Sequence, residues 1–148
     1  MAKRTIKTPF FEIGPKSYLY GDQILDLALA ADAASEKYDV DIIFTCPVVD
    51  IRRVKEATKR IHVFAPHMDP IPVGRGQGSI LPEAVKAAGA HGAMINHVEC
   101  AGTLANLRAE IPSEESVSSN FAGRVFIHPT SSKRTLTSTP DAAFFTSA

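Results

Sequence analysis

Two short segments carry side chains suited to binding an anionic carbonyl compound. Lys16 follows an apolar run at residues 10–13, and Asn96, His97 and Glu99 stand at or just beyond the end of a second run, residues 92–96. A lysine can hold a phosphate as a point charge. An imidazole at the start of a helix is held neutral, because the positive end of the helix dipole disfavours the imidazolium, and it can still donate a hydrogen bond to a carbonyl. The alternatives without a binding role are that Lys16 is simply solvated in a turn and that His97 is a structural histidine.

A glycine-rich segment forms a second candidate site. Within residues 64–79, Gly74, Gly76 and Gly78 occupy alternate positions. Glycine permits backbone conformations in which amides approach an anion or another subunit closely. A plain connecting loop is the alternative, although structureless loops of this length are uncommon in compact domains.

Histidines and carboxylates also offer a metal site as a competing interpretation. The pairs are His67 with Asp69 and His97 with Glu99. Further candidate ligands are His62, His91 and Cys46. No C-x-x-C, H-x-H or H-E-x-x-H spacing is present, so we expect neither a metal nor another cofactor.

Alternating strands and helices are predicted to position these residues. Strands are expected at residues 10–13, 40–45, 61–65 and 92–96, and helices at residues 22–37, 50–60, 79–88 and 102–111. The second helix is expected to begin at Asp50 and to close on Lys59 and Arg60, and the third to run from Ser79 to Gly89. This order predicts a parallel sheet with right-handed crossovers, and no G-x-G-x-x-G motif supports a nucleotide-binding sheet.

Length and composition bound the class of protein. The chain has 148 residues, 45% of them hydrophobic and 22% charged, and its 16 basic and 16 acidic residues cancel. A closed eight-fold β/α barrel needs about 250 residues, so four β/α units are about half of one. Zero net charge predicts no nucleic-acid or membrane-surface partner. Two isolated cysteines and the lack of a long apolar run favour the cytoplasm.

The amino-acid composition changes beyond residue 110. Residues 111–148 hold 8 Ser and 5 Thr in 38 positions, interrupted by one strand-like run at residues 124–128. Such composition is typical of loops or disordered segments. We therefore divide the chain into residues 1–110, an α/β domain, and residues 111–148, a tail that does not continue the pattern.

The continuous stretch from Val63 to Glu99, with the opening segment from Phe11 to Gly21, resembles the triose-phosphate isomerase family. Within it, the resemblance is to the compact archaeal-like branch, whose bacterial relatives include isomerases of four-carbon ketose phosphates. The resemblance covers residues 8–110. It implies a partial (β/α)₈ barrel, an aldose–ketose isomerase of small sugar phosphates working through an enediolate, and a cytoplasmic role in glycolysis and gluconeogenesis.

Family roles carry over residue by residue. By resemblance, His97 polarises the substrate carbonyl, Glu99 belongs to the active-site hydrogen-bond network, and Lys16 and Asn96 bind substrate. Neutral histidine catalysis in this family is an established example of pKa tuning. By the same resemblance, the dimer loop is formed by Gly74, Arg75, Gly76, Gln77, Gly78 and Ser79.

The chain departs from the family in two respects. The family usually has Asn two residues before the lysine, whereas this chain has Gly14. The family's glutamate base, its lid and its phosphate-binding glycine loops belong to the second half of the barrel, and no residue of this chain matches them. Isomerisation requires a base to remove a proton beside the carbonyl. We therefore expect the chain alone to have little or no isomerase activity.

Three hypotheses follow from the sequence. The leading one is a truncated or frameshifted sugar-phosphate isomerase. The second is a non-catalytic half-barrel interaction module that pairs with itself or with a partner through the glycine-rich loop and the open sheet edge. The third is a metal-dependent lyase or hydrolase that uses the histidines and carboxylates.

Overall fold

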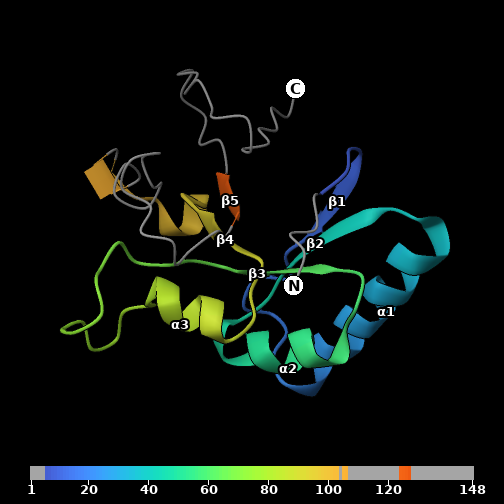
Figure 1. Cartoon of the computed structure of the whole chain (residues 1–148), viewed down its shortest axis with the longest axis horizontal. Coiled ribbons are helices and arrows are strands. Elements are labelled where there is room, and N and C mark those ends of the chain that lie inside the picture. The colour runs from blue at the N-terminus through green and yellow to red at the C-terminus, as the bar shows by residue number, and fades with distance from the viewer. Residues whose placement is uncertain (1–5, 104, 107–123, 128–148) are drawn as a thin grey trace.

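A single parallel β-sheet organises the molecule. The computed structural model describes residues 6–103 and 105–106, and the backbone of 124–127. Within these residues, five strands follow one another in the order β1-β2-β3-β4-β5, and every neighbouring pair is parallel (Figure 1). Their bounds are β1 Phe10–Ile13, β2 Asp41–Thr45, β3 His62–Ala65, β4 Gly92–Ile95 and β5 Arg124–Ile127. Because neighbouring strands in the sheet are also consecutive in the sequence, the chain advances across the sheet in one direction.

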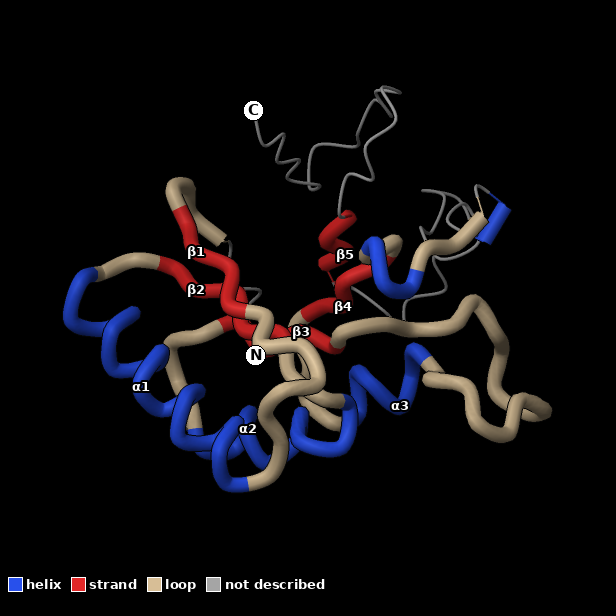
Figure 2. Tube along the Cα trace, turned by 180° about the vertical axis from the view of Figure 1, so that it is seen from behind, coloured by secondary structure: helices blue, strands red, loops and turns tan. Residues whose placement is uncertain are grey.

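Within the described residues, three α-helices lie in the first three crossovers and share one side of the sheet. They are α1 (Asp22–Tyr38), α2 (Ile51–Ala57) and α3 (Pro82–Ala87), with short 3₁₀ turns at η1 (Val48–Asp50) and η2 (Val98–Cys100). Figure 2 shows the strands in a curved row with the helices on its outer side. Among the described residues, no helix is long and apolar enough to span a bilayer.

The main core fills the space between the helices and the outer face of the sheet. Phe44 and Val63 from the strands pack in one cluster with Ile24 of α1 and Ile51 of α2, each of them fully buried. β2 and β3 are buried along their whole length, as is typical of parallel strands with apolar sequences. The buried residues of α1, which are Ile24, Ala28, Ala31 and Ser35, lie at helical spacing along one face and pack against the sheet.

The second helix begins at the predicted cap residue, Asp50, but differs from its prediction in the capping contact and in its end. Asp50 precedes α2 but makes no side-chain cap there, because its carboxylate accepts a hydrogen bond from the Gly21 amide at 3.1 Å. The helix ends at Ala57, so Lys59 and Arg60 lie beyond it. The backbone amides of both residues donate to Asp32 of α1, which competes with continuation of the helix.

The remaining differences concern the third helix and the segments after β4. α3 begins at Pro82 rather than Ser79, and Gly89 follows it with a φ of 98°, as expected of a residue that ends a helix. Of the helix expected at residues 102–111, residues 105–106 are helical and 104 and 107–111 lie outside the described residues. The strand-like run near residue 124 forms β5, paired with β4. The rest of the predicted tail lies outside the described residues.

Candidate active site

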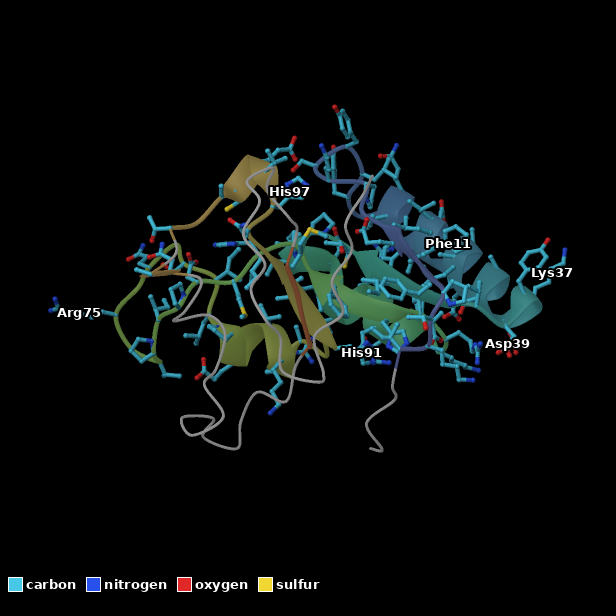
Figure 3. All side chains as sticks on the ribbon, turned by 90° about the horizontal axis from the view of Figure 1, so that it is seen from above. Phe11, Lys37, Asp39, Arg75, His91 and His97 are labelled. Carbon is cyan, nitrogen blue, oxygen red and sulfur yellow. The ribbon has the colours of Figure 1, made fainter. Side chains whose placement is uncertain are left out.

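The parallel sheet brings together two loops that are far apart in the sequence. Lys16 follows the end of β1, and His97 and Glu99 follow the end of β4. The carboxyl ends of parallel strands share one edge of the sheet, which is where sites form in such folds. In Figure 3, His97 lies at the short helical turn that follows β4.

Glu99 bridges the two loops. Its Oε1 accepts a hydrogen bond from Lys16 Nζ at 3.1 Å across 83 residues of sequence, and its Oε2 lies 3.6 Å from His97 Nδ1. The side chains of Lys16 and Glu99 are 47% and 59% exposed, so their ion pair contributes little stability. The pair therefore places an ammonium group beside the imidazole at a surface that a ligand can reach.

The hydrogen bonds of His97 indicate which ring nitrogen carries the proton. The backbone amide of Glu99 donates to Nδ1 at 3.2 Å, so Nδ1 is the acceptor. The 3.6 Å separation from Glu99 Oε2 is too long for a competing hydrogen bond. In the neutral ring the proton then resides on Nε2, and that nitrogen is the one that can donate to a carbonyl oxygen.

The same two loops each contain a residue with an unusual backbone conformation. Lys16 and Asn96 have φ values of 54° and 58°, in the left-handed region that side chains other than glycine rarely adopt. Such conformations cost free energy and persist where the surroundings enforce them, often at functional sites. Asn96 comes directly after β4, and Lys16 is the third residue after β1.

The glycine-rich loop is anchored at its base and exposed at its tip. Asp69 closes the base, because its amide donates to the Ile80 carbonyl at 2.9 Å and its carboxylate accepts from the Ile80 amide at 2.6 Å. Figure 3 shows Arg75 projecting away from the rest of the molecule. The six residues predicted for this loop are all exposed: Gly74, Arg75, Gly76, Gln77, Gly78 and Ser79.

The candidate metal ligands do not converge in the part of the chain that the structure describes. His67 pairs with Asp69 at 3.2 Å, in the base of the glycine-rich loop, and His62 lies 3.7 Å from Asp41 at the opposite end of the strands. No group of three or more His, Cys, Asp or Glu residues is placed to hold a metal within those residues. The metal hypothesis therefore has no supporting cluster there.

One polar pair at this edge of the sheet was not predicted. Thr45 Oγ1 donates to Glu12 Oε1 at 3.1 Å, at the end of β2. The sequence feature that could have predicted this pair is Glu12 itself, because an acidic residue is unusual inside a short strand that is otherwise apolar.

Parallel strands in sequential order, with helices along the outer face and polar loops at the carboxyl edge, define part of a β/α barrel. The structural comparison agrees. Triosephosphate isomerase from Bartonella henselae superimposes with a TM-score of 0.64 at 21% identity, over 80% of this chain and 50% of that one.

Sequence comparison identifies the family. The triosephosphate isomerase family model matches residues 16–117, and the chain belongs to that family. It is 38% identical to triosephosphate isomerase from Saccharolobus solfataricus over 96 residues, 64% of this chain and 42% of that protein. It is 37% identical to the enzyme from Methanobacterium bryantii over 113 residues, 75% of this chain and 50% of that protein. The chain thus spans about half the length of the curated relatives it matches.

Proposed function

We propose that this chain carries the carbonyl-polarising half of an aldose–ketose isomerase site for small sugar phosphates. The observation that supports it is the contact between Lys16 and Glu99 beside His97, which joins the loops after β1 and β4. In this proposal, His97 Nε2 donates to the substrate carbonyl and Lys16 offsets the negative charge that develops on the enediolate. Asn96, at the end of β4, contacts the same substrate.

Glu99 positions its neighbours in this scheme. Its carboxylate orients the ammonium group of Lys16, and its amide fixes the tautomer of His97. The reaction also needs a base to remove the proton beside the carbonyl. Family resemblance assigns that base to no residue of this chain, so the proposal covers binding and polarisation rather than the complete reaction.

Ligand binding tests the proposal. We expect dihydroxyacetone phosphate to bind the wild-type chain in a calorimetric titration, and Lys16→Met to weaken binding about tenfold through loss of a charge-assisted contact. His97→Gln is expected to weaken it to a smaller extent. Lys86→Met, which removes an exposed lysine of α3, is the matched control and should leave affinity unchanged. Equal affinity in wild type and Lys16→Met would contradict the proposal.

Self-association through the glycine-rich loop is a second part of the proposal. We propose that the tip from Gly74 to Ser79 packs against a second copy of the chain, which accords with its exposure and its anchored base. Arg75→Glu with Gln77→Glu should convert a dimer to a monomer in light scattering, because like charges would be buried opposite the partner. A monomeric wild type would refute this part, and Lys37→Glu on α1 serves as the control.

The cellular setting is proposed from the same resemblance. A sugar-phosphate isomerase of this type would act in the cytoplasm, in glycolysis or gluconeogenesis. The division of the chain at residue 110 likewise stays a proposal, and the family match extends to residue 117.

A further inference from the structure

The loop that carries Lys16 is held by the sheet at one end and by a neighbouring loop at the other. It runs from Gly14, after β1, to Gly21, before α1. Inside it, the Tyr18 amide donates to the Pro15 carbonyl at 3.2 Å, which closes a turn around Lys16. Lys16 itself has a φ of 54°. A left-handed residue of this kind costs free energy, so the turn persists only while its surroundings hold it.

Asp50 holds the far end of this loop. Its carboxylate accepts a hydrogen bond from the Gly21 amide at 3.1 Å, across 29 residues of sequence. Asp50 is the last residue of η1, the turn that follows β2, and it is 7% exposed. A buried carboxylate is stable only where hydrogen-bond donors replace the lost water. The contact with the Gly21 amide is therefore costly to break.

The backbone of Gly21 suits this contact. Gly21 has a φ of 59° and a ψ of −125°, a combination that other residues rarely adopt. A Cβ atom added to it would meet nothing within 4 Å, so lack of space does not call for glycine here. The requirement comes from the backbone conformation, which leads the chain from the loop into α1 with the amide directed at Asp50.

A second contact joins the same two segments, but it lies in solvent. Arg53 of α2 pairs with Asp22, the first residue of α1. Their side chains are 47% and 85% exposed, so this ion pair contributes little stability. Asp50 is therefore the contact that fixes where the loop ends. Asp22, of the same residue type and at the same junction, provides a matched control.

The reach of Lys16 depends on the placement of its loop. Its ammonium group contacts Glu99, on the loop after β4, at 3.1 Å. The lysine stem is flexible, so the position of its backbone decides which atoms the ammonium group reaches. Misplacing a site group by about 1 Å can lower activity about 10²-fold. Restraint at both ends of the loop also reduces the conformational freedom lost when a ligand binds.

We propose that Asp50 is a positioning residue for Lys16, because it holds the Gly21 amide and so fixes the loop that presents the ammonium group to the substrate. This inference rests on the proposed function, in which Lys16 binds the substrate. Asp50 touches no substrate in this scheme and acts only through the Gly21 amide.

Calorimetric titration of the full chain with dihydroxyacetone phosphate tests the inference. Asp50→Ala should weaken binding about fivefold, less than the roughly tenfold loss expected for Lys16→Met. Asp50→Asn keeps an acceptor oxygen for the Gly21 amide and should recover most of the affinity. Asp22→Ala removes the same charge from the same junction and should change the affinity less than about twofold.

A second variant perturbs the same contact from its other partner. Gly21→Ala strains the backbone without a steric clash and removes no atom from the buried surroundings of Asp50. It should weaken binding as Asp50→Ala does. Thermal melting identifies the folded variants, and Gly21→Ala decides the question where Asp50→Ala does not fold.

A double-mutant cycle separates positioning of Lys16 from a general structural role. In a Lys16→Met background, neither Asp50→Ala nor Gly21→Ala should lower the affinity further, because the residue through which both act is already gone. Additive losses would contradict the inference. Hydrogen exchange of the Tyr18 amide gives a readout without ligand, since Asp50→Ala should speed this exchange and Asp22→Ala should not.

The outcomes separate the two proposals. Wild-type binding that both Asp50→Ala and Gly21→Ala leave unchanged overturns the positioning role and leaves the proposed function intact. A wild-type chain that does not bind dihydroxyacetone phosphate overturns the proposed function, and the positioning role with it.

Discussion

At the scale of single residues, environment decides what each reactive group can do. The two cysteines show this contrast. Cys46 follows β2 in the core and Cys100 is exposed in the turn after β4. Burial, with a smaller contribution from the nearby charge of Asp50, raises the pKa of the Cys46 thiol to about 12. Because the thiolate is the reactive form, Cys46 is chemically inert in the folded chain.

Thiol labelling should therefore distinguish the two cysteines. With an aromatic disulfide reagent near neutral pH, we expect one thiol, Cys100, to react promptly, and Cys46 to react only as the chain unfolds. Cys100→Ser should abolish the fast phase, and guanidinium should expose both thiols. Rapid labelling of Cys46 in the folded protein would contradict the packing of β2 against the helices.

At the scale of elements, the loops after the strands hold their shape through specific backbone contacts. The base of the glycine-rich loop depends on Asp69, whose pKa is held below its ordinary value of 3.8 chiefly by the hydrogen bond from the Ile80 amide, with a smaller contribution from His67. Partial burial opposes this shift without reversing it. The same interaction that lowers the pKa secures the loop.

The loop base should consequently weaken in acid. Because the folded pKa of Asp69 is lowered, its stabilising contribution is present above the unfolded value of about 4 and is lost as pH falls through the folded pKa. We expect the Ile80 amide resonance to shift with a midpoint below pH 4. Asp69→Asn, which keeps an acceptor oxygen, should abolish that titration. A midpoint above pH 4 would show that the carboxylate does not hold the Ile80 amide.

At the scale of the whole molecule, the described residues form two layers of part of a barrel, with the strands inside and the helices outside. The edge strand β1 presents Phe11, which is 64% exposed on the face that carries the helices. Exposed edges and apolar side chains of this kind favour association with other chains. This feature and the exposed loop tip both point to assembly as the property to measure first.

Catalysis by the purified 148-residue chain is expected to be slow or absent. In the proposed function the chain supplies the donor to the carbonyl and family resemblance assigns the base to none of its residues, and removing a general base costs about 10² to 10⁴ in rate. A coupled assay of dihydroxyacetone phosphate conversion measures this. His97→Gln is the baseline for adventitious activity, and turnover near that of an intact family member would contradict the expectation.

The sequence alone determined the element types and the grouping of Lys16, His97 and Glu99, because hydrophobic periodicity is local and parallel strands end at one edge. Only the tertiary structure decided the long-range polar contacts: Asp50 to Gly21, Asp32 to the amides after α2, and Glu12 to Thr45. These contacts depend on strand register and on the distance between elements, which no local pattern encodes. For that reason the sequence predicts Asp50 as a helix cap, whereas in the structure its carboxylate accepts from the Gly21 amide.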